Sequence, residues 1–297
     1  MSLEQRVREI LADAGAQGWV HAIRLGGGRA REVDVGADEL VVTASVYKLA
    51  LLVALCRSFD AGALDPRERV LLDPASCTPG PTGVSTFLDP VRLSWRDLAA
   101  SMISVSDNAA ADVILGAIGL DAVAEALAAA ELTRTRVVGG TADAHAALVE
   151  EMGASSAAEA FALLADNDEA RTVRAYDPSY ASATTPREMT RLLGQIWGDE
   201  IASPQRCAFM RRLLAGQAWM HRVRAGFPFQ GVRVAGKTGT IGAVRNEVSV
   251  VEFEGEDPVA VAVFTLAARA DPALPRVDSA IAECARIAVT DLRSGRL

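Results

Sequence analysis

The two lysines of this chain are its most informative basic residues. Of the 30 lysine and arginine residues, only Lys48 and Lys237 are lysines. An ammonium group can lose its proton at accessible pH, whereas a guanidinium group does not. Lysine is therefore the basic residue that can accept a proton during a reaction. An arginine-rich genome would also leave a chain with few lysines. The residues around each lysine therefore have to show whether it has a chemical role.

Lys48 forms a Ser-x-x-Lys pattern with Ser45. A spacing of three places both side chains on one face of a helix, about one turn apart. A serine hydroxyl becomes a nucleophile when a base lies within hydrogen-bond reach. Burial beside the apolar residues 49–55 would lower the pKa of Lys48 and fit it for that role. Alone, the pattern also fits a helix-capping serine next to a surface lysine.

Lys237 opens a second polar pattern, Lys-Thr-Gly-Thr at residues 237–240, after an expected strand at 232–235. The pattern combines a positive charge, two hydroxyl groups and a glycine that lets a ligand lie close to the backbone. Such a strand edge suits an anionic, peptide-like substrate that binds by strand addition. The alternative is a polar strand end that leads into a turn.

The elements expected around these patterns are strands at both ends of the chain and helices in its middle. Apolar spacing predicts helices over 3–14, 46–59, 94–103, 108–117, 121–131, 143–152, 156–165, 186–197, 204–216 and 276–293. Alternating residues predict strands over 18–25 and 31–35, joined by Gly26-Gly27-Gly28, and over 232–235, 248–253 and 259–266.

This order predicts an α/β (α+β) fold, with one antiparallel sheet flanked by terminal helices and a separate all-helical lobe. Residues 1–42 and 217–297 are expected to form a discontinuous sheet domain, and residues 43–216 a helical domain. The seam between the two domains is a natural place for a ligand site.

A third pattern, Ser106-Asp107-Asn108, completes a set of three in the order Ser-x-x-Lys, Ser-Asp-Asn, Lys-Thr-Gly. Serine and aspartate are also ordinary helix caps, so the conjunction carries the argument. The chain resembles the penicillin-recognising serine enzymes, namely the class A β-lactamases and the D-alanyl-D-alanine peptidases. The resemblance includes the residues before Ser106, from 87 onward, a Thr-Thr-Pro at 184–186 and Arg-Asn-Glu at 245–247. It implies a β-lactamase-like fold.

The resemblance also implies roles for individual residues. Ser45 would be the acylated nucleophile and Lys48 its proton acceptor, while Ser106 would relay a proton to the leaving nitrogen. Asn108 would bind the amide side chain of the substrate, and the backbone N–H groups of Ser45 and Thr240 would form the oxyanion hole. Residues implied to hold the substrate and its carboxylate are Asn108, Lys237, Thr238, Gly239, Thr240 and Arg245.

One part of the family pattern is missing. In class A β-lactamases a glutamate in a Glu-x-x-Leu-Asn loop holds the water that hydrolyses the acyl-enzyme, and no such pentapeptide occurs here. The interval from Ser106 to Thr185 is longer than usual for that family and contains an insertion around 142–175. Possible substitutes for the missing base are Glu150, Glu151 and Glu169, although the sequence favours an ordinary surface role for each of them. We expect the insertion to form a lid or a wall next to the site.

Three functions follow from these patterns. The first is a serine hydrolase that is acylated at Ser45 by a carboxylate-bearing amide, β-lactam or ester. The second is a true β-lactamase whose deacylation base has moved into the insertion. The third is a penicillin-binding sensor or scaffold without turnover. Stable acylation without release favours the third function, and rapid release favours the second. Failure to be acylated by a β-lactam, together with hydrolysis of simple esters, favours the first.

The composition limits the other partners. The 38 acidic residues exceed the 30 basic ones and give a net charge of −8, which argues against a nucleic-acid or anionic-membrane surface. No apolar run approaches the roughly 18 residues that span a bilayer. The scattered cysteines (Cys56, Cys77, Cys207, Cys284) show no metal-ligand spacing, so neither a metal nor an organic cofactor is expected. We expect a monomer that binds a small molecule.

The first residues of the chain predict where it is found. They form a charged amphipathic stretch without the continuous apolar segment of a secretory signal. We therefore expect a cytoplasmic protein as the sequence stands, or a secreted or periplasmic one if a signal has been removed.

Overall fold

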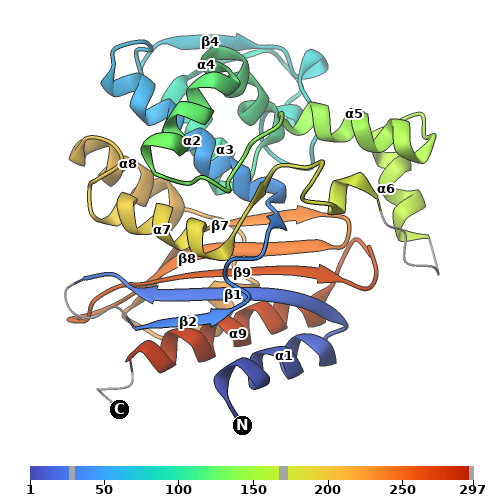
Figure 1. Ribbon diagram of the computed structural model, residues 1–297. Helices are drawn as coiled ribbons and strands as arrows, with labels where there is room; N and C mark the ends of the chain where they lie inside the picture. Colours follow the sequence, from blue (N-terminus) through green and yellow to red (C-terminus); the bar gives the residue numbers. More distant parts are fainter. Residues whose placement is uncertain (27–30, 167–172, 294–297) are drawn as a thin grey trace.

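The computed structural model of the protein describes residues 1–26, 31–166 and 173–293. A twisted antiparallel sheet divides the molecule, with two helices on one face and a helical lobe on the other (Figure 1). The predicted fold class is confirmed. No helix in the described ranges combines the length and the apolar character needed to cross a bilayer.

The sheet has five strands, and its central pair joins the two ends of the chain. In spatial order the strands are β2 (Glu32–Val35), β1 (Ala16–Arg24), β9 (Val259–Ala267), β8 (Val244–Phe253) and β7 (Val232–Ile241). Every neighbouring pair is antiparallel. The sequence predicted that residues 237–240 follow the strand. They lie instead inside β7, because they continue the ladder opposite residues 245–248 of β8.

Both faces of the sheet are covered, which explains why β9 is apolar at nearly every position. Val259, Val261 and Val263 pack with the terminal helices α1 (Leu3–Asp13) and α9 (Pro275–Arg293). The alternate residues Ala260, Ala262 and Phe264 pack with the helical lobe. The domain limits predicted at 42/43 and 216/217 stay a prediction, since the inner face of the sheet and the lobe share one core.

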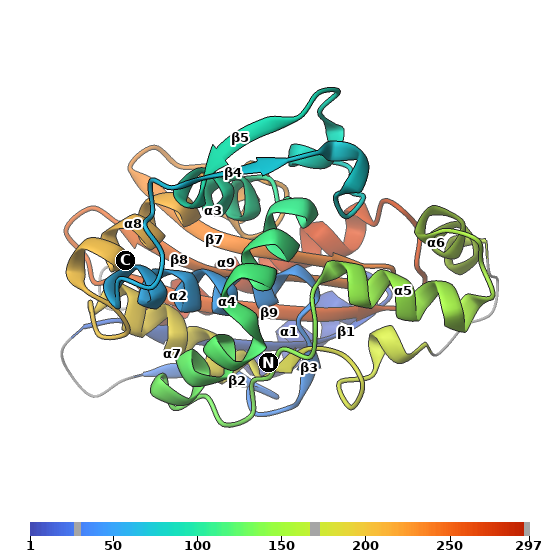
Figure 2. The same cartoon turned by 90° about the horizontal axis from the view of Figure 1, so that it is seen from above.

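The helical lobe is built around α2. Its main helices are α2 (Tyr47–Asp60), α3 (Trp95–Ser104), α4 (Asn108–Ala129), α7 (Pro186–Trp197) and α8 (Pro204–Ala215). Leu49, Leu51, Leu52 and Leu55 of α2 are all fully buried, since α3, α4 and α8 contact this helix (Figure 2). Burial of each leucine contributes about 1.5–3 kcal/mol, so α2 is a firm base for the residues at its first turn.

Short elements complete the lobe. The two helices expected over 108–117 and 121–131 are the two segments of α4, which meet at Gly119, where a φ of +79° and a ψ of 162° are not helical. Two small ribbons that the sequence analysis did not include pair β4 (Arg69–Leu72) with β5 (Val91–Ser94), and β3 (Val41–Val42) with β6 (Ala183–Thr184).

The insertion forms a projection at one side of the molecule (Figures 1 and 2). It contains α5 (Thr141–Met152) and α6 (Ala157–Ala165), which agree with the helices predicted at 143–152 and 156–165. These helices have a small core of their own, formed by Leu148, Ala160, Leu164 and Val173.

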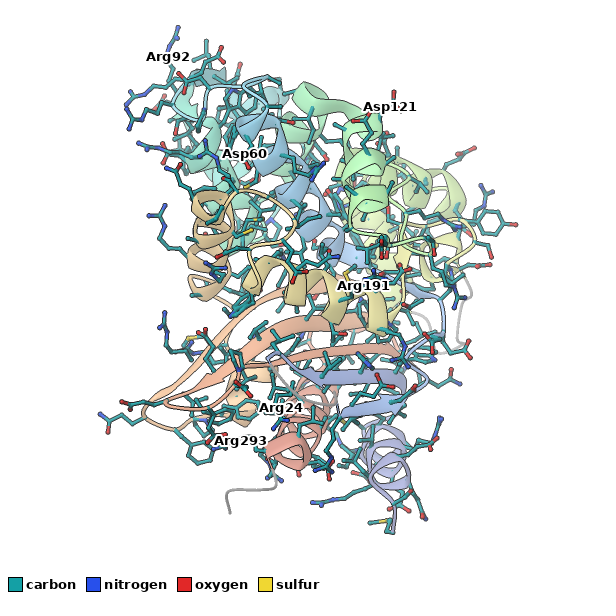
Figure 3. All side chains as sticks on the ribbon, turned by 60° about the vertical axis from the view of Figure 1, so that its left-hand side comes forward. Arg24, Asp60, Arg92, Asp121, Arg191 and Arg293 are labelled. Carbon is teal, nitrogen blue, oxygen red and sulfur yellow. The ribbon has the colours of Figure 1, made fainter. Side chains whose placement is uncertain are left out.

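Charged side chains cover the outer surface of the molecule (Figure 3). Several form ion pairs between elements: Arg191 of α7 with Glu131 after α4, Asp60 of α2 with Arg206 of α8, and Arg293 of α9 with Glu256. Exposed pairs of this kind contribute between about 0 and 1 kcal/mol, so the cores described above dominate stability.

Candidate active site

Ser45 lies in a tight turn that connects the sheet to α2. The turn is the 3-10 segment η1 (Ala44–Val46), and Ala44 has a φ of +44°, which is strained for a residue with a side chain. Asn246 of β8 holds the turn by donating hydrogen bonds to the carbonyls of Val42 (2.8 Å) and Thr43 (3.2 Å). A Cβ at Gly239 would lie 2.6 Å from the Thr43 carbonyl oxygen, so glycine allows β7 to approach the turn.

Lys48 lies one turn further along and is fully buried. Its amine donates to the Ser106 carbonyl (2.6 Å), to Asn108 Oδ1 (2.8 Å) and, at a longer distance of 3.4 Å, to Ser106 Oγ. Burial lowers the pKa of Lys48 to about 7, against the opposing effect of two nearby aspartates. A large share of the amine is therefore neutral at neutral pH and able to accept a proton.

Ser106 lies between the two lysines. It adopts a φ of +61°, and its hydroxyl accepts a hydrogen bond from Lys237 Nζ at 2.9 Å. The next residue, Asp107, is buried and fixes this loop by accepting hydrogen bonds from Ser101 Oγ (2.6 Å) and from the backbone N–H of Val84 (2.9 Å). The Ser106 hydroxyl is thus placed by the surrounding structure.

Lys237 is the second fully buried lysine. Its amine donates to Ser106 Oγ and to the Thr238 carbonyl (2.7 Å). Burial lowers its pKa well below the ordinary value, and the positive charge of Lys48 lowers it further. The structure therefore brings Lys48, Ser106, Asn108 and Lys237 together, as the sequence patterns predicted.

The threonines beside Lys237 lie on the opposite face of β7. Gln217 Oε1 accepts a hydrogen bond from the Thr238 N–H (2.7 Å), and Arg222 donates to Thr240 Oγ1 (2.8 Å) and to the Gly239 carbonyl (2.9 Å). Arg222 is 3% exposed and also pairs with Asp278 at 2.6 Å. The sequence analysis missed Arg222, because an arginine outside any pattern gave no signal.

Arg245 occupies a different place from the one that its predicted role suggests. It lies opposite Thr240 in the ladder, but its guanidinium donates to the carbonyls of Gly242, Val244 (3.1 Å), Asp271 (2.9 Å) and Pro272 (3.5 Å). Burial and the nearby Arg222 lower its pKa to about 10. Arg245 therefore fixes the β7–β8 turn, and its role as a carboxylate ligand stays a prediction.

Of the candidates for a deacylation base, the two that the structure describes form no hydrogen bond with the lysines. Glu151 accepts the backbone N–H of Arg174 at 3.0 and 3.1 Å, and Glu150 is exposed. Glu169 falls outside the described residues. Within the ranges that the structure describes, no carboxylate forms a hydrogen bond with Ser45, Lys48 or Lys237.

Ser45 opens into a cavity of about 370 Å³ that extends toward the insertion. One end is formed by Ser45, Asn108 and Thr240, and the other by residues of α5, α6 and the segment 174–182. Within the described residues, no group of three histidine, cysteine, aspartate or glutamate side chains is arranged to hold a metal.

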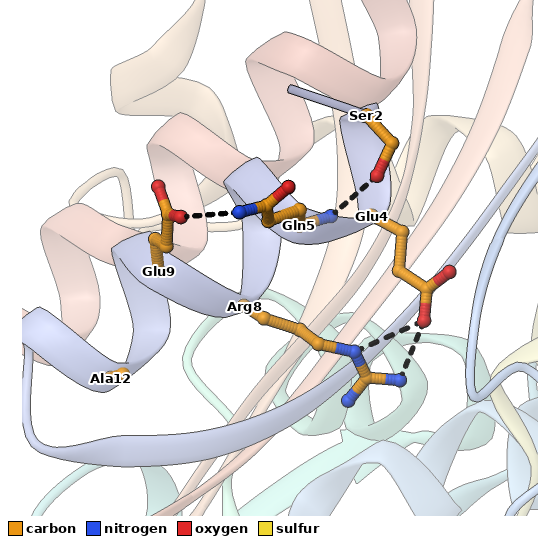
Figure 4. Close-up of a pocket in the computed structure, with 6 residues that line it drawn as sticks. All are labelled: Ser2, Glu4, Gln5, Arg8, Glu9 and Ala12. Atoms are coloured by element: carbon orange, nitrogen blue, oxygen red, sulfur yellow. Dashed lines mark hydrogen bonds and ion pairs between the residues drawn. The ribbon is translucent and has the colours of Figure 1, made fainter.

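A second hollow lies on the outer face of α1 (Figure 4). Its polar side chains bond to one another: Arg8 donates to Glu4 at 2.9 Å, and Gln5 donates to Glu9 at 3.1 Å. Because α1 packs against α9 and the outer side of the sheet, this hollow is separated from Ser45 by the sheet. Its groups satisfy each other and form an ordinary solvated helix face.

The comparisons with known proteins agree with this geometry. Residues 2–292 match the family described as the β-lactamase enzyme family. A β-lactamase of Amycolatopsis lactamdurans is 30% identical over 305 residues, covering 98% of this chain and 85% of the relative. The β-lactamase regulatory protein BlaB of Streptomyces cacaoi is 27% identical over 300 residues, covering 96% of each chain.

A solved structure supports the fold independently. The β-lactamase from Sphaerobacter thermophilus superimposes with a TM-score of 0.77, covering 97% of both chains at 23% identity. At this identity the likeness concerns the fold, while the family is shown by the match over nearly the whole sequence. The chain belongs to the β-lactamase enzyme family.

Proposed function

We propose that this protein is a serine hydrolase that opens β-lactams or related carboxylate-bearing amides and esters through an acyl-enzyme at Ser45. The observation that carries the proposal is the buried row of Lys48, Ser106 and Lys237, joined by hydrogen bonds next to the cavity that Ser45 lines. Charges are buried in this way at a cost in stability, and such sites are usually functional. The names of the relatives support β-lactams as substrates.

We infer the acylation step from these groups. The neutral amine of Lys48 takes the proton of the Ser45 hydroxyl while the serine oxygen attacks the substrate carbonyl. The backbone N–H groups of Ser45 and Thr240 stabilise the oxyanion. When the carbon–nitrogen bond breaks, Ser106 donates its proton to the nitrogen and regains one from a neighbouring lysine.

The substrate carboxylate is bound at the Lys237 end of the row. Protonated Lys237 supplies the charge, and the hydroxyl group of Thr240, which lines the same cavity as Ser45, donates a hydrogen bond. Arg222 orients this hydroxyl through its 2.8 Å contact. The role of Thr238 as a carboxylate ligand stays a prediction. Binding of a carboxylate favours the protonated form of Lys237, since in the free protein its described hydrogen-bond partners are neutral oxygens.

Deacylation is the slower half of the reaction in this proposal. Hydrolysis of the acyl-enzyme requires a base that activates water, and no carboxylate of the described chain contacts Ser45 or Lys48. The acyl-enzyme is therefore expected to accumulate when the protein meets a penicillin.

Intact-mass measurement during incubation with benzylpenicillin tests this function. Wild-type protein should gain the mass of the penicillin, and Ser45→Ala should not. Ser58→Ala, which changes a serine near the end of α2 and outside the site, is the matched control and should gain the adduct normally. Absence of any adduct together with unchanged penicillin would refute the proposal. Rapid loss of penicillin with a sparse adduct would instead establish fast turnover and a base within the insertion.

A further inference from the structure

The insertion supplies most of one wall of the cavity at Ser45. From α5 come residues such as Ala144, Ala147 and Leu148, and from α6 comes Phe161. Val138, before α5, lines the same cavity. These side chains offer apolar surface facing the space that leads away from the nucleophile.

His145 of α5 adds a ring without a positive charge to this wall. It packs edge to face with Phe161, with ring centroids 5.6 Å apart and an interplanar angle of 84°. Burial lowers the pKa of His145, so the ring is neutral at neutral pH. Its Nδ1 atom is buried and has no hydrogen-bond partner in the described structure. An N–H at that atom would be left unsatisfied, which favours the tautomer with its proton on Nε2.

The charged residues of the cavity are exposed, and both acids hold backbone groups. The Asp143 carboxylate accepts the N–H of Gly140 at 2.8 Å, and Glu151 accepts the N–H of Arg174. Two acids face one base, so the charges around the cavity do not favour an additional anion.

This wall is anchored to the catalytic residues. Asp112, one turn after Asn108 on α4, accepts hydrogen bonds from the N–H groups of Thr141 (2.7 Å) and Ala142 (2.8 Å) at the start of α5. The Tyr47 hydroxyl, next to Lys48, bonds Thr141 Oγ1 at 3.0 Å. The first turn of α5 is therefore held at a fixed position relative to the nucleophile.

We propose that α5 and α6 form a subsite for a bulky, uncharged apolar group on the acyl side of the substrate. The proposal rests on the proposed function, because the group is defined by its attachment to the carbonyl that Ser45 attacks. The wall offers apolar surface and one neutral ring, and it has no net positive charge. It therefore selects an aryl or branched alkyl group over a small or an anionic one.

Three penicillins that share one ring system and one carboxylate test the subsite. They carry an acetyl, a phenylacetyl or a carboxyphenylacetyl group, and the second-order rate of adduct formation is measured by intact mass. We expect the phenylacetyl compound to acylate wild-type protein ~10-fold faster than either of the others. Ala147→Phe, which fills the cavity from an exposed position, should reduce this preference to about onefold to twofold.

Matched variants separate the subsite from general damage. Ala146→Phe places the same ring on the exposed surface of α5 outside the cavity and should keep the wild-type preference. Ala144→Phe repeats the filling at a second exposed position, and thermal unfolding shows that each variant is folded. Equal rates for the three penicillins, or a preference for the carboxyphenylacetyl compound, would overturn the subsite while leaving Ser45 acylation intact. Absence of every adduct would refute the proposed function itself.

Discussion

The buried row of Lys48, Ser106 and Lys237 lies beside the cavity that Ser45 and the inserted helices line, but the row and the insertion are held in place by different interactions. Lys48 and Lys237 are fully buried, and hydrogen bonds from their amines join α2 and β7 to the segment 106–108. The insertion has its own small apolar core, and the first turn of α5 is tied to α4 by Asp112.

Because of this difference, the buried row and the insertion can have separate roles, the row in the reaction itself and the insertion in the choice of substrate. Reacting groups require positions within fractions of an ångström, which a large shared core provides. A wall that selects the acyl group can change its side chains without disturbing the nucleophile, because it packs on a separate core. Changes in the row should therefore affect rate for every substrate, whereas changes in the insertion should affect choice among substrates.

The largest expected effect is the loss of the base. Lys48→Met keeps the length of the side chain and removes the amine, so acylation by every penicillin should slow by ~10³-fold. Because the pKa of Lys48 is lowered to about 7, a large share of the amine is neutral in the wild-type protein, and the substitution removes this proton acceptor. Stopped-flow or intact-mass rates measure the change, with circular dichroism as the check on folding. Acylation within tenfold of wild type would show that another group accepts the proton.

A pair of leucine truncations tests whether the two regions have separate cores. Leu52→Ala in α2 should lower the free energy of unfolding by about 3 kcal/mol, because the residue lies in the shared core. Leu164→Ala in α6 should cost about 2 kcal/mol and act locally, since only the small core of the insertion loses packing.

Hydrogen exchange distinguishes a local effect from a global one. Leu164→Ala should accelerate exchange in α5 and α6 and leave α2 protected, while Ser45 is still acylated by acetyl-substituted penicillin. Faster exchange throughout the chain in this variant would show that the insertion and the lobe unfold as one unit.

The elements that carry the catalytic row could be predicted from the sequence, because their patterns are local. The apolar run after Lys48 indicates a buried helix, and the alternation of Val232 and Val234 indicates the strand that leads to Lys237. The meeting of the three motifs at one place followed from the family resemblance.

The position of the insertion and the contacts of Arg222 and Arg245 could not be predicted from the sequence. Two helices were predicted there, but their position at the cavity that Ser45 lines depends on the hydrogen bonds of Asp112, a residue outside every motif. Arg245 was assigned by its place in a motif, yet the two-residue turn at Gly242 lets its guanidinium bind nearby carbonyls. Burial of Arg222 beside Thr240 depends on long-range packing that no local pattern encodes.

The pH dependence of acylation tests the protonation states of Lys48 and Lys237. The reactive form of Lys48 is neutral, and its pKa is lowered to about 7. The rate should therefore fall about tenfold per pH unit below 7 and level off above it. Since Lys237 must stay protonated to bind the carboxylate, binding should weaken at higher pH. A rate that still climbs tenfold per unit between pH 8 and 9 would show an ordinary lysine pKa and contradict the burial argument.

The smallest expected effect concerns Glu151, a predicted deacylation base that lines the cavity of Ser45. Its carboxylate holds the backbone N–H of Arg174, so Glu151→Gln should change the lifetime of the acyl-enzyme by no more than about twofold. Glu150→Gln, on the exposed side of the same helix, is the matched control. Decay of the adduct mass after removal of free penicillin gives both lifetimes. If only the Glu151 variant held its adduct ~100-fold longer, that carboxylate would be the general base, and the insertion would contribute to hydrolysis as well as to selectivity.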